Sequence, residues 1–232
     1  MPEAMVASLY ERLRPTKLED FIGCPLTPAE FENRFKNRQG PILVYGPIGC
    51  GKSSMALIIG SFILGAQIPH LADVWNYADG KTLYGRHLNA DQFDIALFKQ
   101  LGGLADHRVF IIDEAQILGD KKVTFLRGLV EKDHKSTYVL VTSDLAAFGD
   151  KGALKTRCDT VVMSPLDSAD REKLAQRGWA AMGKSGAVPA GLLANFEQYD
   201  NPPINSPRVV LDIVEKFANG APADRAIRES RI

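Results

Sequence analysis

The 232-residue sequence has few cysteines and histidines, and none is placed as a disulfide framework or a zinc module would require. The three cysteines, Cys24, Cys50 and Cys158, have no paired spacing, and the four histidines lie near none of them in the sequence. This pattern excludes a disulfide-stabilised scaffold and a cysteine-rich metal module. It is typical of a protein whose thiols stay reduced inside the cell.

The sequence also lacks an excess of charge of either sign and a long apolar run. Lys and Arg number 28, as do Asp and Glu, so no global basic field indicates a nucleic-acid partner. Any contact with DNA must come from a local patch. The longest apolar region, 55–66, is too short and too interrupted by Gly and Ser to span a bilayer, and the N-terminus has no signal-peptide pattern. We therefore expect a cytoplasmic protein without membrane contact.

The most informative segment is 41–54, where a short apolar run meets Gly46-x-x-x-x-Gly51-Lys52-Ser53. This spacing predicts a phosphate-binding loop between a strand and a helix. Its glycines let backbone N–H groups turn inward around phosphates, and the N-terminus of the following helix faces the anion. Lys52 supplies a cation and Ser53 a hydroxyl ligand for Mg²⁺. The expected contacts with ATP are Gly46, Pro47, Ile48, Gly49, Cys50, Gly51, Lys52, Ser53 and Ser54.

A pair of carboxylates, Asp113-Glu114, directly follows an apolar run at 109–112. Such a run predicts a buried strand, and open α/β sheets bind ligands at the carboxyl ends of their strands. We expect Asp113 to hold Mg²⁺ through water and Glu114 to orient or deprotonate the attacking water. An Asp-Glu pair after a strand is also a common helix N-cap. Hydrolysis is the favoured interpretation because the phosphate loop lies upstream.

Strand and helix patterns alternate as far as Pro165. Apolar runs predict strands at 42–45, 86–90, 109–112, 138–142 and 160–163, with helices at 28–37, 54–64, 91–101 and 121–132, whereas 67–85 shows no clear period. The alternation predicts an α/β fold over 1–165, a five-stranded parallel sheet with helices on both faces. Helical patterns at 167–182, 189–198 and 206–218 predict a small all-helical lid over 166–219. The tail, 220–232, is expected to be mobile.

The order of these landmarks, from Leu9 to Phe217, resembles that of AAA+ ATPases, and within them the replication clamp-loader clade. The segment 10–15, followed by Phe21-Ile22-Gly23, is similar to the clade's N-terminal arm, which forms one wall of the adenine pocket. The resemblance thus implies that Tyr10 and Ile22 contact the base. Residues 113–116 are similar to the Walker B box, and 141–144 to the sensor 1 strand end. Ser143 is therefore implied to face the γ-phosphate.

Two arginines complete the resemblance. Residues 154–158, Leu-Lys-Thr-Arg-Cys, are similar to the clamp loaders' Ser-Arg-Cys box, with Thr156 in place of the serine. This implies that Arg157 reaches into the ATP site of a neighbouring subunit. Arg208, in Ser206-Pro207-Arg208, resembles sensor 2, which contacts phosphate from the same chain. The catalytic set implied is Glu114, Lys52 and Arg157, in an ATPase that works as a homo- or hetero-oligomer on DNA and loads a partner such as a sliding clamp.

Other readings of the sequence stay open. The collar domain and zinc module of clamp loaders are not found, so either the chain is a truncated or minimal version or its ATPase surfaces alone mediate assembly. Segments 13–15, 21–23 and 206–208 resemble the Holliday-junction branch-migration motor about as well. A helicase-loader motor, a small-molecule kinase and a non-hydrolysing assembly subunit are further alternatives. Lys99, Lys121 and Lys122 form the candidate DNA patch, with plain solubilising lysines as the alternative.

Overall fold

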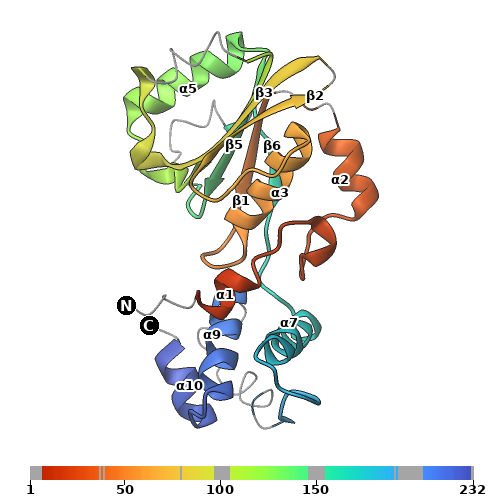
Figure 1. Cartoon of the computed structure of the whole chain (residues 1–232). Helices are drawn as coiled ribbons and strands as arrows, with labels where there is room; N and C mark the ends of the chain where they lie inside the picture. The colour runs from red at the N-terminus through yellow and green to blue at the C-terminus, as the bar shows by residue number, and fades with distance from the viewer. Residues whose placement is uncertain are drawn as a thin grey trace, which may run out of the picture.

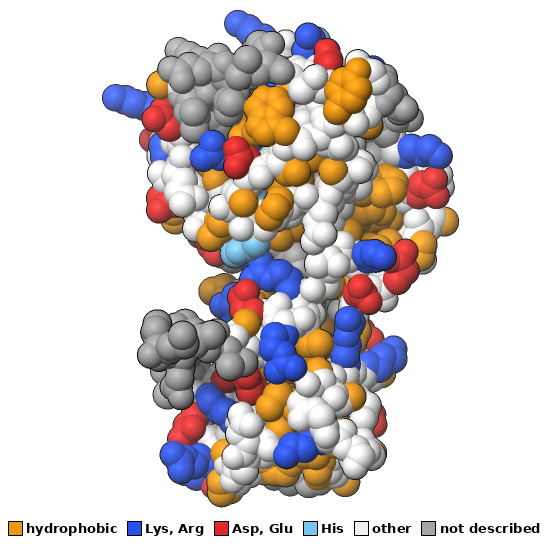
Figure 2. All heavy atoms as spheres, viewed as in Figure 1, with side chains coloured by type: hydrophobic (Ala, Val, Ile, Leu, Met, Phe, Trp, Pro, Cys, Tyr) orange, Lys and Arg blue, Asp and Glu red, His pale blue; other side chains and the backbone are white. Residues whose placement is uncertain are grey.

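The computed structural model describes residues 7–36, 38, 40–78, 80–96, 105–145, 155–190, 192 and 206–230. Figure 1 shows a sheet with helices on both faces and, below it, a group of helices near which both chain ends lie. The molecule narrows between these two parts, and Lys and Arg side chains gather around the narrow middle on the face drawn in Figure 2. The division into domains at 165 and 219 stays a prediction.

The sheet has six strands within the described residues, in the order β2-β3-β4-β5-β1-β6. Its parallel strands are β1 (Gly40–Tyr45), β3 (Lys81–Asn89), β4 (His107–Asp113), β5 (Ser136–Thr142) and β6 (Asp159–Val162). The α/β class and the five predicted strands are confirmed. The prediction omits β2 (Asp73–Ala78), which pairs antiparallel with β3 at the sheet edge. Every second residue of this strand, Asp73, Trp75 and Tyr77, is exposed. A strand with one exposed face does not need a continuous apolar run, which is the pattern on which the prediction of the other strands depended.

Alternate residues of the central strands bury their side chains on opposite faces of the sheet. Ile42 and Val44 of β1 pack with α3 (Lys52–Leu64), whereas Leu43 packs with α5 (Asp120–Lys132) in a second cluster. Each fully buried aliphatic side chain contributes roughly 1.5–3 kcal/mol. The sheet is therefore a rigid base for the loops at its carboxyl edge.

The helix α2 (Pro28–Phe35) begins as its sequence predicts. Thr27 and Glu30 form a capping box, Pro28 occupies the first turn, and Phe31 and Phe35 are buried. Short 3₁₀ turns lie at Leu18–Asp20, Ala90–Gln92 and Ala115–Ile117. The second of these stands where the predicted 91–101 helix begins, and residues 97–101 of that segment lie outside the described residues.

The helical part consists of α7 (Ser168–Ala181), α9 (Pro207–Ala218) and α10 (Ala223–Ser230) around a third apolar cluster. Leu9 of α1 (Leu9–Arg12), a single helical turn near the N-terminus, is buried in the same cluster. Most of the predicted 189–198 helix lies outside the described residues. No helix in the described part of the chain is long and apolar enough to cross a membrane.

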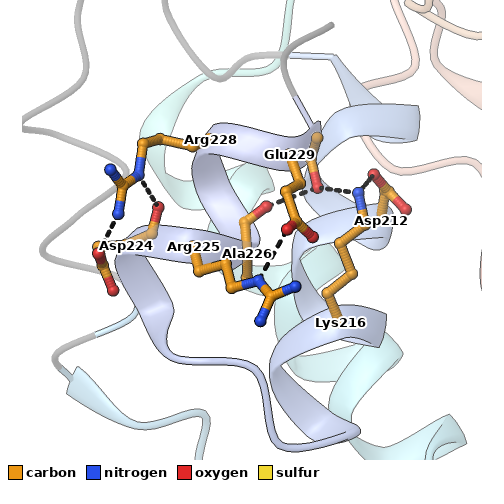
Figure 3. Close-up of polar contacts among 8 residues, drawn as sticks. Asp212, Lys216, Asp224, Arg225, Ala226, Arg228 and Glu229 are labelled. Atoms are coloured by element: carbon orange, nitrogen blue, oxygen red, sulfur yellow. Dashed lines mark hydrogen bonds and ion pairs between the residues drawn. The ribbon is translucent and has the colours of Figure 1, made fainter.

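The helix α10 lies within the segment 220–232, for which the sequence supports only the expectation of a mobile tail. Ala226 and Ile227 are buried against the third cluster, and Lys216 of α9 donates to Ser230 Oγ at 3.2 Å (Figure 3). Exposed pairs spaced four residues apart, Arg225 with Glu229 and Arg228 with Asp224, add local support (Figure 3). Ala223, Ala226 and Ile227 have helical spacing, but three apolar residues in a short charged segment form too weak a pattern to predict this helix.

Candidate nucleotide site

The phosphate loop (residues 46–53) joins the carboxyl end of β1 to α3, as its spacing predicts. Gly51 has φ +89°, and a Cβ there would lie 2.8 Å from Phe21 Cζ. A Cβ on Gly46 would collide with the backbone carbonyl of Met163. These two positions therefore require glycine, one for its conformation and both for space.

Lys52 and Ser53 stand where the phosphate-loop motif predicts, at the start of α3. The Lys52 ammonium donates to Pro47 O at 2.7 Å, so the side chain folds back over the loop. The Ser53 hydroxyl lies close enough to the carboxylate of Asp113, at the end of β4, to help lower the pKa of that carboxyl group. The structure thus brings together the two residues predicted to hold Mg²⁺, one from α3 and one from β4.

Asp113 has an unusual electrostatic environment, because it is only 7% exposed. Burial alone would raise its pKa, but the nearby His87 ring, the Ser53 hydroxyl and the hydrogen bond from the Glu114 N–H together outweigh burial and hold the pKa of Asp113 below its ordinary value. The carboxylate is therefore ionised at neutral pH, as a metal ligand must be.

The oxygen donors of Ser53 and Asp113 suit a hard cation such as Mg²⁺. The described residues contain no group of three or more His, Cys, Asp or Glu that could hold a metal. Mg²⁺ usually keeps several waters and phosphate oxygens as ligands, so a sparse protein shell fits it.

Glu114 occupies a left-handed backbone conformation, with φ +52°. Its carboxylate is exposed and accepts a hydrogen bond from Gln116 Nε2. The same amide nitrogen lies 3.4 Å from Ser143 Oγ, and Gln116 Oε1 accepts a hydrogen bond from Thr142 Oγ1 at 3.0 Å. Gln116 therefore links the predicted catalytic carboxylate to the predicted γ-phosphate contact on the neighbouring strand.

Two residues of this site were not singled out from the sequence. Gln116 was read only as part of a four-residue box, and His87 lies in β3 with no partner at a recognisable spacing. Both residues contact segments that are distant in sequence: His87 lies near Asp113, and Gln116 near Thr142 and Ser143. Such contacts leave no local pattern, so only the folded sheet reveals them.

The N-terminal arm and the helical part approach the phosphate loop from the other side. Tyr10 and Ile22 line a cavity of about 40 Å³ together with Gly51 and Ser54. Tyr10 also borders a wider hollow of about 540 Å³, which reaches Ile48, Gly49 and Arg208.

The helix α9 contacts this region through its first residues. The Arg208 guanidinium lies 5.0 Å from the centre of the Tyr10 ring, and Ser206 Oγ donates to Gly49 O at 3.2 Å. The structure thus places Tyr10, Ile22 and Arg208 beside the phosphate loop, as the resemblance implies.

Arg157 lies away from this site. It precedes β6, which runs parallel to β1 with Asp159 beside Ile42, whereas the phosphate loop follows β1. The 6 residues of β1 separate the two edges of the sheet by roughly 20 Å. Arg157 is exposed and forms an ion pair with Glu131 at 2.9 Å. Its side chain therefore does not reach its own phosphate loop.

The candidate DNA patch is only partly described. Lys99 lies outside the described residues. Lys121 is exposed, but Lys122 donates to Ala90 O at 3.2 Å and lies 5.9 Å from the centre of the Phe93 ring. Lys122 is thus held against the protein surface rather than extended into solvent.

The sequence and the fold were compared with those of known proteins. No protein-family model matches the chain. The chain is 26% identical over 177 residues to replication factor C subunit 3 of Oryza sativa subsp. japonica, covering 75% of the chain and 48% of that relative. It is 28% identical over 178 residues to the ATPase WRNIP1 of Dictyostelium discoideum, covering 74% of the chain and 19% of that relative. The chain spans about half, or less, of the length of these curated relatives.

Solved structures with a similar fold include a RuvB variant of Thermotoga maritima, with a TM-score of 0.64 and 15% identity over 94% of this chain and 72% of that one. A structure from work on katanin self-assembly has a TM-score of 0.61 and 16% identity, and covers 93% of this chain and 78% of that one. At such identities the similarity concerns the fold. In its motifs, its fold and its sequence relatives, the chain thus resembles AAA+ ATPases of the clamp-loader kind.

Proposed function

We propose that the chain binds ATP with Mg²⁺ and hydrolyses it as one subunit of an oligomer that acts on DNA. The observation that carries this proposal is the meeting of Ser53, Asp113 and Glu114 beside the phosphate loop, although they come from two separate segments. A helix cap alone would not require Asp113 to be buried, ionised and close to Ser53, the residue after the loop lysine.

In this proposal the phosphate-loop N–H groups and Lys52 bind the β- and γ-phosphates, and Ser53 and Asp113 hold Mg²⁺. The bound ion would neutralise charge that develops on the transferred phosphoryl group. Glu114 orients the attacking water or takes its proton, and Ser143 contacts the γ-phosphate. The Gln116 amide nitrogen contacts both side chains and so keeps Glu114 and Ser143 at a fixed position relative to each other.

The remaining contacts come from the arm and the helical part. Tyr10 and Ile22 form a wall for the adenine ring, and Arg208 reaches the phosphates from α9. Because Ser206 donates to the phosphate loop and stands two residues before Arg208, the position of α9 depends on the loop it touches.

Assembly is proposed because Arg157, which pairs with Glu131 on the protein surface, stands at the sheet edge remote from its own loop and so does not reach its own phosphates. Loading of a partner protein, such as a sliding clamp, is favoured over branch migration or helicase loading. Replication factor C subunits are among the sequence relatives, whereas the similarity to RuvB is one of fold. The exposed Lys121 is a candidate contact with DNA.

Calorimetric titration with ATP tests the nucleotide assignment. Lys52→Ala should abolish measurable binding, because it removes the cation that faces the terminal phosphates. The matched control is Lys121→Ala, an exposed lysine on α5, which should bind ATP like the parental protein. Glu114→Gln should bind ATP but turn it over about 10²–10⁴-fold more slowly, since the carboxylate acts only on water.

Unchanged ATP affinity in Lys52→Ala would refute the phosphate-loop assignment. Turnover by Glu114→Gln at the parental rate would show instead that another group activates the water.

A further inference from the structure

His87 is a buried histidine whose ring has one satisfied nitrogen and one that points at the candidate metal site. Its side chain is 0% exposed. The Leu71 N–H donates to Nδ1 at 2.9 Å, so the neutral ring carries its proton on Nε2. Nε2 lies 3.5 Å from Asp113 Oδ2 and has no hydrogen-bond partner among the described residues. Burying such a donor without a partner is costly, and Asp113 is the acceptor it faces.

The surroundings of the ring fix its orientation. Leu71 has φ +52°, an uncommon conformation for a residue other than glycine, at the residue whose N–H meets the ring. The ring of His70 lies 4.8 Å away, centre to centre. The strand β3 carries His87 alongside β4, with Asn89 beside Asp113 in the register. The His87 ring is thus held by the Leu71 N–H, in the loop before β2, and by the pairing of β3 with β4.

We propose that His87 is a positioning residue for Asp113, which rests on the proposed ATP–Mg²⁺ function. Its Nε2 lies 3.5 Å from Oδ2, while Oδ1 accepts the Glu114 N–H at 3.0 Å. A free aspartate carboxylate rotates broadly about its last side-chain bond. Partners on both oxygens restrict that rotation and keep the carboxylate in the orientation that meets Ser53. Loss of such an outer partner typically lowers metal affinity about 10–100-fold.

This role differs from simple filling of the core, because it depends on a hydrogen-bond donor. His87→Leu keeps apolar volume in the same place but removes the donor. His87→Gln retains an amide N–H that can be aimed at Asp113. The matched control is His107→Leu, at the other end of β4 from Asp113.

The experiment measures Mn²⁺ binding by electron paramagnetic resonance in the presence of saturating ATP, beside calorimetric binding of ATP in EDTA. His87→Leu should bind Mn²⁺ about 10–100-fold more weakly, with ATP binding in EDTA unchanged. His87→Gln should recover most of the loss, and His107→Leu should show none. ATP turnover by His87→Leu should approach the parental rate as Mg²⁺ is raised.

Parental Mn²⁺ affinity in a folded His87→Leu variant would overturn the inference. If that variant does not fold, His87→Gln decides: affinity within a few-fold of the parental value supports the inference, and a loss as large as that of His87→Ala overturns it. Failure of the parental protein to bind ATP in EDTA would instead refute the proposed function, and the inference with it.

Discussion

Glu114 combines a predicted chemical role with a backbone conformation that glutamate rarely adopts. The left-handed conformation costs a residue with a Cβ roughly 1–2 kcal/mol. Here the neighbouring Asp113 carboxylate accepts a hydrogen bond from the Glu114 N–H, and Gln116 Nε2 donates to the Glu114 carboxylate. Both the backbone and the side chain of Glu114 are therefore held in place. The sharp turn aims a carboxylate out of the end of a buried strand.

This strain can be measured by two substitutions at the same position. Glu114→Gly should be more stable than Glu114→Ala by about 1 kcal/mol, because glycine adopts positive φ without penalty, although it loses more entropy on folding. The free energy of unfolding in urea gives the comparison. Equal stability of the two variants, or a more stable alanine variant, would show that the turn at Glu114 is not strained in solution.

At this scale the phosphate loop, Asp113 and Glu114 were predictable, because their chemistry depends on residues close together in sequence. His87 and Gln116 were not, since their partners lie on other strands. The contacts of Lys122 could not be predicted from the sequence either. Lys122 donates to Ala90 O, and these two residues belong to segments that β4 separates along the chain.

Among the elements, α2 is held to the edge strand β6 by charge. Arg34 Nε donates to Asp159 Oδ1 at 2.9 Å, and Arg38 lies 3.8 Å from Oδ2. The hydrogen bond from Arg34 lowers the pKa of Asp159 below 3.8, against an opposing effect of burial. A carboxyl group whose pKa is lower in the folded state stabilises the fold above its unfolded pKa, and that contribution is lost as pH falls through the folded pKa.

Asp159→Asn should therefore be less stable than the parental protein near pH 7, and the difference should shrink as the pH falls below 3.8. Urea unfolding at a series of pH values measures this. Glu32→Gln is the control, because Glu32 forms an exposed pair with Lys36 on the same helix and should change stability little. A difference between Asp159→Asn and parent that is independent of pH would contradict the prediction.

Whether an element could be predicted depended on how it buries its apolar residues. The strands β1, β4 and β5 are buried on both faces, so they read as apolar runs. The strand β2 is half-exposed at an edge and has no apolar run, and α10 is short, with only three apolar residues, Ala223, Ala226 and Ile227. Both are stabilised by neighbours that the sequence does not identify.

For the whole molecule, the position of Arg157 predicts activity that depends on assembly. Arg157→Ala should bind ATP but hydrolyse it about 10³-fold or more slowly, because a guanidinium from a neighbour stabilises charge on the transferred phosphoryl group. Mixing it with Glu114→Gln should restore part of the activity, since the second variant lends its arginine to an intact Glu114 site. Steady-state ATPase assays over a range of protein concentrations measure both effects.

The control is Arg225→Ala, an exposed arginine on α10 that should leave hydrolysis unchanged. If the mixture stays inactive where the parental protein is assembled and active, Arg157 does not act between subunits. A kinase that works as a monomer would show neither rescue nor a rise of specific activity with concentration.

The packing of α1 against α9 has a consequence for how the chain folds during synthesis. Leu9 is buried in the cluster around α9, and its N–H donates to Glu215 Oε2 at 3.1 Å. A ribosome adding about 5–20 residues per second needs on the order of 10–40 s to progress from α1 to α9. Contacts this distant along the chain also form slowly, because the intervening segment must be ordered first. A nascent chain can therefore complete the sheet and its phosphate loop before α9 has been synthesised. During that time Leu9 of α1 has no partner helix against which to pack.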